Sequence, residues 1–236
     1  MRLFLLQEIE AAKRILLLHQ SASPQHFTIT NGVHRVAKGG SIMTFFSRNY
    51  DRLMGPLENK IIRSFRERLL RTVKGNVLEI GSGTGLNFSC YREADQVVAI
   101  EPNRVMREKS MIRAEQASVP IEVVGAGAEK LPFEDQTFDA VVGTLVLCTI
   151  PDPESALLEM KRVCKTGGTL VFLEHVRMNH ALWGRLQDWL TPAWSRVCDG
   201  CHLNRNAVDM IQKAGFRIVT VEKKYKGLVV VIHAEK

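Results

Sequence analysis

Short apolar runs alternate with longer segments in which apolar residues recur at helical spacing through most of the chain. This pattern predicts, in order, strand 76–80, helix 85–92, strand 96–101, helix 103–116, strand 121–125, strand 138–144, helix 153–164 and strand 168–174. Strands that alternate with helices indicate a mostly parallel sheet with helices on both faces and right-handed crossovers.

The two ends of the chain have different patterns. Residues 216–222 and 228–234 are apolar runs joined by a basic segment with a glycine, which predicts an antiparallel hairpin at the sheet edge. Residues 57–72 place apolar and basic positions on opposite sides of a helix, which we expect to cover the sheet with basic residues such as Arg66 facing away. Residues 3–18 predict a short amphipathic helix, and 21–41 predict a flexible linker.

Composition agrees with one folded domain. The chain has 236 residues, of which 45% are hydrophobic and 24% charged, as in an ordinary globular protein. Net charge is +7, and its excess lies early: residues 1–75 hold 13 Lys and Arg against 5 Asp and Glu, whereas 76–236 hold 19 against 20. The basic region either attracts an anionic partner, such as a lipid surface or a polyanion, or is a solvated helix face.

Cysteine use and hydropathy bear on the compartment. The chain has five cysteines, an odd number, and the apolar start Met1–Leu6 is interrupted by Gln7 and Glu8 before it reaches the length of a signal-peptide core. No stretch approaches the roughly 20 apolar residues of a transmembrane helix. We therefore expect reduced thiols and a cytoplasmic protein, with peripheral membrane contact through the basic N-terminal region as the alternative.

A glycine-spaced turn follows the first predicted strand. Gly81, Gly83 and Gly85 allow the backbone to bend sharply and to bring its N–H groups close to a ligand. Glu79 precedes this turn, and the spacing differs from the dinucleotide fingerprint, whose third glycine comes three residues after the second. A second acid, Glu101, ends the next strand 101 − 81 = 20 residues after the first glycine, where it can accept hydrogen bonds from ribose hydroxyls.

With these motifs the chain resembles the class I S-adenosylmethionine (SAM)-dependent methyltransferases. The likeness continues through Ala126–Phe133, Phe138–Val142 and Lys165–Leu170, in the order seen in small-molecule enzymes similar to the ubiquinone and menaquinone C-methyltransferases, over roughly residues 45–236. It implies an α/β, Rossmann-like class I methyltransferase fold, with a seven-stranded, mostly parallel sheet, helices on both faces and an antiparallel C-terminal hairpin. It also implies an enzyme that uses SAM and releases S-adenosyl-L-homocysteine.

The resemblance assigns a set of cofactor-binding residues. They are Glu79, Gly81, Ser82, Gly83, Gly85, Glu101, Pro102, Asn103, Ala128, Glu129, Thr144 and Leu145. The same resemblance implies that the turn Leu131-Pro132-Phe133 closes over the adenine ring and that Gly143-Thr144-Leu145 borders the methionine part of the cofactor. Two positions depart from the family pattern, because Ala128 stands where an Asp is frequent and Thr166 stands before Gly167-Gly168. A strand-end salt bridge for Glu79 and a surface position for Glu129 are the alternatives.

A narrower resemblance concerns the acceptor. Together with Thr144–Cys148 and Leu173–Val176, the segment Leu190–Arg205 is similar to the membrane-associated alkyl-thiol methyltransferases over roughly residues 77–216. Members of that family carry an N-terminal hydrophobic anchor, which this sequence does not show. The resemblance implies a small, apolar acceptor thiol.

The domain boundary follows from the same resemblances. The segment that begins at Met43 resembles the usual start of this domain. We therefore predict a helix-plus-linker extension over residues 1–42 and the methyltransferase domain over residues 43–236, with Met43 as a hypothetical natural initiator.

Candidate catalytic residues lie in the second half of the chain. His175, at the end of its strand, is the first candidate for a base that deprotonates the acceptor, followed by His202 and Asp199; an ordinary surface or strand-end role is the alternative for each. Cys198-x-x-Cys201-His202 matches a haem-attachment pattern, but no secretory leader accompanies it. A single Cys pair also lacks a second ligand pair at zinc-finger spacing, so no metal is predicted.

Several functions remain open at this level. A SAM-dependent methyltransferase for a small acceptor with sulfur, carbon or oxygen as the nucleophile is the leading interpretation, and a lipid or quinone-precursor methyltransferase at a membrane surface is the nearest alternative. Trp183, Trp189 and Trp194 either wall an apolar acceptor pocket or belong to the core. An RNA methyltransferase is favoured only by the charge, because the Asn-Pro-Pro-Tyr type of motif is absent, and a noncatalytic SAM-binding protein is the last possibility.

Overall fold

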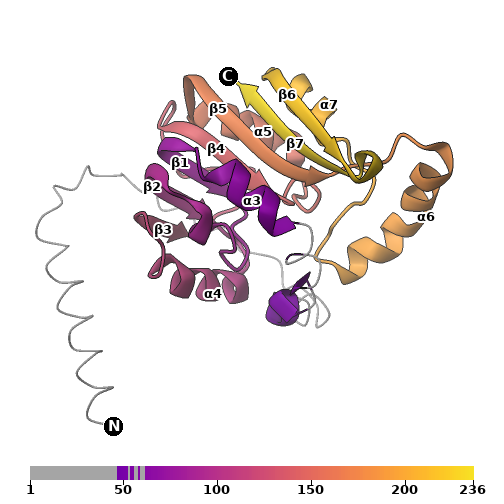
Figure 1. Cartoon of the computed structure of the whole chain (residues 1–236), viewed down its shortest axis with the longest axis horizontal. Coiled ribbons are helices and arrows are strands. Elements are labelled where there is room, and N and C mark those ends of the chain that lie inside the picture. Colours follow the sequence, from indigo (N-terminus) through magenta and orange to yellow (C-terminus); the bar gives the residue numbers. More distant parts are fainter. Residues whose placement is uncertain (1–46, 53, 56–57, 59–61) are drawn as a thin grey trace, which may run out of the picture. The chain divides into compact units, whose positions relative to one another are not determined.

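A computed structural model describes residues 47–52, 54–55, 58 and 62–236 (Figure 1). The predicted helix over residues 3–18, the linker over residues 21–41 and the boundary after residue 42 lie outside the described residues, so they stay predictions. Of the predicted helix 57–72, the structure describes α3, Arg63–Leu70.

Seven strands of the described part form one sheet, and each was predicted from the apolar pattern to within a few residues. They are β1 (Lys74–Ile80), β2 (Glu93–Ile100), β3 (Ile121–Val124), β4 (Phe138–Thr144), β5 (Cys164–His175), β6 (Arg217–Lys224) and β7 (Val229–Glu235). Their order across the sheet is β3-β2-β1-β4-β5-β7-β6. The first five strands are parallel, whereas β7 runs antiparallel to both β5 and β6. The predicted mostly parallel sheet with an antiparallel C-terminal hairpin is confirmed.

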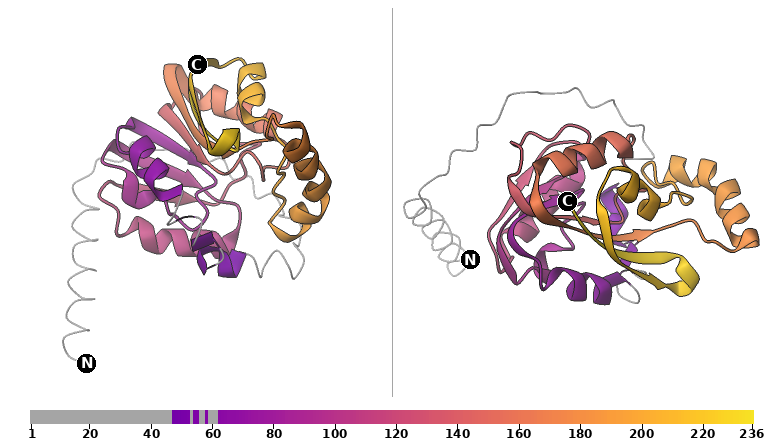
Figure 2. Two further views of the ribbon diagram at one scale, coloured as in Figure 1. Left: turned by 45° about the vertical axis from the view of Figure 1, so that its right-hand side comes forward. Right: turned by 90° about the horizontal axis from the view of Figure 1, so that it is seen from above.

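The sheet is covered on both faces because alternate residues of a strand point to opposite sides. Leu78 and Ile80 of β1 join a core that contains α5 (Pro153–Val163) and α7 (Ala207–Lys213), whereas Val77 joins a second core with α3. In the view from above, α5 and α3 lie on opposite sides of the sheet (Figure 2). The strands are therefore apolar on both faces, as expected of a buried parallel sheet.

The predicted helix over residues 85–92 is wrong. The chain makes turns there, with a single 3-10 turn at Phe88–Cys90. The segment is short for a helix, and its Asn87, Ser89 and Cys90 are weak helix formers. Burial of the Phe88 and Tyr91 side chains then determines the conformation of this segment.

One long helix and one short helix follow β5 in a region where the apolar pattern predicted no element. They are α6, Ala181–Val197, and α7, and α6 contains Pro192, which normally ends a helix. Trp183, Trp189 and Trp194 of α6 are exposed, so the alternative that they belong to the core is wrong, and the alternative of an acceptor pocket stays a prediction. None of the helices that the structure describes is both long and apolar enough to cross a bilayer.

Candidate functional site

The carboxyl ends of parallel strands meet at one edge of a sheet, where ligands of open α/β folds bind. The glycine turn after β1 lies at this edge, and Gly81, Gly83 and Gly85 all have positive φ angles of 64°, 57° and 82°. A Cβ at Gly81 would collide with Val146, and one at Gly85 would lie 2.9 Å from the Phe88 ring. A Cβ at Gly83 would meet nothing within 4 Å, so this part of the turn is open to a ligand.

Glu101 is fixed beside the turn by main-chain donors. The N–H of Gly83 donates to its Oε2 and the N–H of Asn103 to its Oε1, each at 2.8 Å. The Asn103 side chain caps α4 (Arg104–Ala114) by accepting from the N–H groups of Val105 and Met106. Burial raises the pKa of Glu101 although both hydrogen bonds lower it. The carboxylate is thus held in one orientation and keeps further lone pairs for a ligand.

Glu79 is engaged by the protein on both oxygens. Tyr91 donates its hydroxyl to Oε2 at 2.6 Å, and Asn87 Nδ2 donates to Oε1 at 3.1 Å. Burial raises the pKa of Glu79 to about 7, against the effect of these two hydrogen bonds. Glu79 thus links β1 to Asn87 and Tyr91, which follow the glycine turn. Its predicted contact with the cofactor stays a prediction.

The Glu79 network continues into α3. Asn87 also donates from Nδ2 to Thr144 Oγ1 at 2.8 Å and accepts at Oδ1 from Arg66 at 2.6 Å. Arg66 in turn contacts Glu58 at 2.8 Å and is 5% exposed. The prediction that Arg66 faces away from the sheet is therefore wrong. Arg66 is buried because its guanidinium donates hydrogen bonds to Glu58 and Asn87 next to the site.

The segment Ser47–Arg52 lies over the cofactor turn. Thr84 donates its hydroxyl to Asp51 at 2.6 Å, and Asn103 Nδ2 donates to Ser47 Oγ at 2.8 Å. Ser47 donates to Asp199 at 3.0 Å, so the segment also reaches the loop after α6. Tyr50 lies in the same segment, and burial raises its pKa to about 12.

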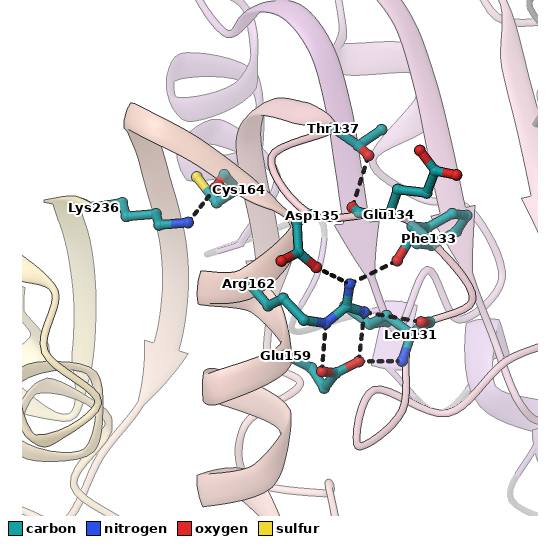
Figure 3. Close-up of polar contacts among 9 residues, drawn as sticks. All are labelled: Leu131, Phe133, Glu134, Asp135, Thr137, Glu159, Arg162, Cys164 and Lys236. Atoms are coloured by element: carbon teal, nitrogen blue, oxygen red, sulfur yellow. Dashed lines mark hydrogen bonds and ion pairs between the residues drawn. The ribbon is translucent and has the colours of Figure 1, made fainter.

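The turn predicted to border the adenine is braced from α5. Figure 3 shows Arg162 donating to the carbonyl oxygens of Leu131 and Phe133, while Glu159 accepts from the N–H of Leu131. Ala128 is buried in the core, and Glu129 accepts from the N–H of Asp152 at 3.5 Å. Ala128 has no polar side-chain atom, so any polar contact of this position with a ligand runs through the backbone.

Two further predicted residues follow β4. Thr144 is buried and bonded to Asn87, and Leu145 has a φ of +53°, in the left-handed region. Its N–H donates to the carbonyl of Leu173 at 2.7 Å. A left-handed nonglycine residue costs about 1–3 kcal/mol and persists where surrounding contacts enforce it, which occurs often at functional sites.

His175 lies in a cluster with two cysteines. Its Nε2 is 3.2 Å from Cys201 Sγ, and one ligand atom of each of His175, Cys201 and Cys148 lies within 4.8 Å of the others. A hydrogen bond from Cys148, together with His175, lowers the pKa of Cys201, whereas the same bond and burial raise the pKa of Cys148. Burial opposes protonation of His175, yet its contact with Cys201 leaves its pKa raised.

The other two predicted catalytic residues lie beside this cluster. Asp199 accepts from Ser47, and burial raises its pKa. His202 Nδ1 lies 2.7 Å from the carbonyl oxygen of Gly200, and the main-chain N–H of His202 donates to the carbonyl oxygen of Cys148 at 2.9 Å. The cysteines were missed as site residues because the segments of Cys148, His175 and Cys201 meet only in the folded chain.

Unpaired polar atoms mark the same sheet edge. Among the described side chains, three buried polar atoms have no hydrogen-bond partner: Ser82 Oγ, Glu174 Oε2 and His175 Nδ1. Buried polar groups are normally paired, so atoms of this kind call for a ligand or water. With the open Gly83 and the fixed Glu101, the unpaired Ser82 hydroxyl makes the turn fit a nucleoside such as that of SAM. Pro102 and Asn103 follow Glu101 after the end of β2.

Comparison with known proteins agrees with this geometry. Residues 78–172 match the family model described as a methyltransferase domain. Human thiol S-methyltransferase TMT1A is 35% identical over 176 residues, which span 72% of each chain. Human thiol S-methyltransferase TMT1B is 31% identical over 184 residues, which span 73% of this chain and 75% of that protein.

The fold is also that of solved methyltransferases. A SAM-dependent methyltransferase of Thermotoga maritima, described as a possible histamine N-methyltransferase, superposes with a TM-score of 0.60 at 23% identity over 83% of this chain and 99% of that chain. The family match, the human relatives and the glycine turn at the carboxyl end of β1 lead to one conclusion. The chain belongs to the class I SAM-dependent methyltransferases.

Proposed function

We propose that this methyltransferase transfers the methyl group of SAM to the sulfur of a small, apolar thiol. The observation that carries the proposal is the cluster of Cys148, His175 and Cys201, which lies at the carboxyl edge of the sheet close behind Thr144 and Leu145. These last two residues are the ones predicted to border the methionine part of the cofactor. The cluster is thus placed where a methyl acceptor would approach.

The chemistry of methyl transfer to sulfur requires a thiolate. The new bond joins the acceptor sulfur to the methyl carbon, while the bond to the sulfonium sulfur breaks and leaves its electron pair there. Bound SAM supplies a methyl group that is already activated by a good leaving group. What remains for this chain is to align the acceptor, exclude water and remove the thiol proton, because the thiolate is the nucleophile.

The cluster is suited to the removal of that proton. His175 and Cys148 already hold the Cys201 sulfur in hydrogen bonds, and the two cysteine-bearing segments are partly shielded from water. A thiol that enters this environment meets an imidazole and two sulfur atoms. The relatives TMT1A and TMT1B are thiol S-methyltransferases, which supports the same choice of acceptor for this chain.

A panel of acceptors tests the proposal. The full-length protein is first titrated with SAM by calorimetry and then incubated with SAM and an alkanethiol, the alcohol of the same carbon skeleton, a phenol, a quinone precursor, phosphatidylethanolamine vesicles or RNA. Mass spectrometry should detect the methyl thioether of the alkanethiol and no methylated alcohol. Methylation of the phenol, quinone precursor, lipid or RNA in place of the thiol would overturn the thiol assignment and would favour the corresponding alternative.

A further inference from the structure

The Cys148, His175 and Cys201 side chains form a donor set as well as a hydrogen-bonded cluster. They come from three segments: the loop after β4, the last residue of β5 and the loop after α6. Two sulfur atoms and one imidazole nitrogen lie together, whereas removal of a proton from an acceptor thiol would require only one base. Thiolate and imidazole are the ligands preferred by Zn²⁺.

We propose that Cys148 Sγ, His175 Nε2 and Cys201 Sγ bind one thiophilic divalent cation, Zn²⁺ in the first place, and that its fourth position receives the acceptor thiol. The proposal rests on the function proposed above, which it extends from the class of acceptor to the means of its activation. It also replaces the expectation of no metal, which was drawn from the spacing of Cys198, Cys201 and His202 alone.

The distances fit a tetrahedral ion. With Zn–S bonds of about 2.3 Å and Zn–N bonds of about 2.0–2.1 Å, neighbouring ligand atoms lie roughly 3.5–3.8 Å apart. His175 Nε2 and Cys201 Sγ are 3.2 Å apart, and all three ligand atoms lie within 4.8 Å of one another. Shifts of up to about 1 Å between ligand atoms would therefore complete the site.

The two cysteine-bearing loops are held together by hydrogen bonds to main-chain carbonyl groups. The N–H of His202 donates to the carbonyl of Cys148 at 2.9 Å, and Arg205 donates to the carbonyl of Ile150 at 2.7 Å. Leu145 and Asp199 precede the two cysteines by three and two residues, and both have a φ of +53° in the left-handed region. Backbone of this kind persists where surrounding contacts enforce it, which indicates that each loop is held in its conformation.

Three ligands from the protein leave one position open, as in catalytic zinc sites, whereas structural zinc sites are closed by four. Cys148 is buried, but His175 and Cys201 are partly exposed, so an acceptor can reach the ion. Binding the ion would release the protons of Cys148 and Cys201. The acceptor thiol would then bind as a thiolate and release its own proton to water, and the uncharged thioether would leave because it is a weaker ligand.

In this state His175 is a ligand and not a base, because its Nε2 lone pair is on the metal. Its unpaired Nδ1 keeps the remaining ring proton. Activation of the acceptor comes from the cation, which lowers the pKa of a bound nucleophile.

Cobalt spectroscopy tests this site without reference to turnover. The reduced full-length protein is freed of metal with a chelator and titrated with Co²⁺, whose thiolate complexes absorb strongly, and the zinc content of protein purified without chelator is measured by mass spectrometry. We expect one ion per chain. Cys148→Ser, Cys201→Ser and His175→Ala should each weaken binding at least about tenfold. Cys198→Ser, the same change three residues away in the same loop and outside the cluster, should leave it unchanged.

Butanethiol added to the Co²⁺ protein in the absence of SAM should change the absorption spectrum, because it enters the fourth position. Absence of metal binding by the folded wild-type protein, equal loss in Cys198→Ser, or full thiol methylation by metal-free protein would each overturn the metal site. The last result would leave the proposed thiol methyltransferase intact. Metal binding without any thiol methylation would instead overturn the proposed function, and circular dichroism of each variant separates loss of ligand from loss of fold.

Discussion

The carboxyl ends of β1 and β5 both carry a buried glutamate, but the two glutamates have different surroundings. Glu79 at the end of β1 is 1% exposed, and both of its oxygens accept hydrogen bonds from Tyr91 and Asn87. Glu174 near the end of β5 is fully buried; its Oε1 accepts from the N–H groups of Val146 and Leu147, whereas its Oε2 has no partner. Burial raises the pKa of each to about 7.

The difference separates two halves of the site. The cofactor half, around Glu79 and Glu101, is a nearly complete hydrogen-bond network that is preorganised before any ligand arrives. The acceptor half, around Glu174 and His175, contains two of the three unpaired buried polar atoms of the described side chains. A ligand thus finds more unpaired polar atoms to bind in the acceptor half. Substitutions in one half should therefore change cofactor binding, and substitutions in the other half should change methyl transfer.

The largest difference between the effect on turnover and the effect on SAM binding is expected at His175. His175→Ala should lower the turnover of an alkanethiol at least about 100-fold, because loss of the imidazole removes the group that promotes formation of the acceptor thiolate. The SAM dissociation constant should not change, since the cofactor half lies around β1 and β2. Steady-state kinetics and SAM calorimetry measure the two effects, with the exposed His180→Ala as control. Equal turnover in the two variants would remove His175 from the acceptor half.

The next effect is a pH dependence of stability, to which Glu79 contributes from the cofactor half and Glu174 from the acceptor half. An acid whose pKa rises from 4.5 to about 7 on folding holds more protons in the folded than in the unfolded state between these pH values. The free energy of unfolding therefore falls as the pH rises from about 4.5 to about 7, by roughly 3 kcal/mol from this group. Tyr91, Arg66 and Glu101 are the other titratable groups that act on it.

Urea unfolding of the wild-type protein and Glu79→Gln at several pH values isolates this contribution. Glu79→Gln should flatten the fall between pH 4.5 and 7, whatever its effect on absolute stability, because glutamine does not titrate. A control is Glu122→Gln, which changes an exposed acid on β3. Identical pH slopes for the wild-type protein and Glu79→Gln would show that Glu79 ionises like the exposed Glu122, with no raised pKa.

A smaller effect is expected at Glu101. Glu101→Ala should weaken SAM binding by about 1–3 kcal/mol, because charge-assisted hydrogen bonds to the ribose are lost. It also removes the acceptor for the N–H groups of Gly83 and Asn103, which loosens the turn. Calorimetry with Glu122→Ala as the matched control measures the change. An unaltered SAM dissociation constant would withdraw the ribose assignment.

The cofactor half could be predicted from the sequence because its parts are local. Glu79 lies just before the turn that contains Gly81, Gly83 and Gly85, and Glu101 follows at the end of the next strand. The strands were predictable for a related reason: their apolar residues serve cores on both faces, so β4 begins and ends where the apolar run does.

The acceptor half and the network below the turn could not be predicted in this way. Arg66 has the sequence context of a solvated helix face, yet it is buried because Asn87 and Glu58 offer it two acceptors. Cys148 and Cys201 become neighbours only when the loops after β4 and α6 meet, and no local spacing encodes that contact. The missing helix at residues 85–92 has the same origin, because burial of Tyr91 decides the local structure.

The smallest predicted effect has opposite signs for the two states of the protein. Ser82 Oγ is buried without a partner, so Ser82→Ala removes an unsatisfied polar atom and should leave the SAM-free protein equally stable or slightly more stable. The same change should weaken SAM binding by about 1 kcal/mol if the hydroxyl finds its partner on the cofactor. Thermal unfolding with and without SAM measures both quantities in one series, and Ser118→Ala at an exposed loop position serves as control. Lower stability of Ser82→Ala without SAM would mean that the hydroxyl is already paired in the free protein, and the cofactor half would then be complete before SAM binds.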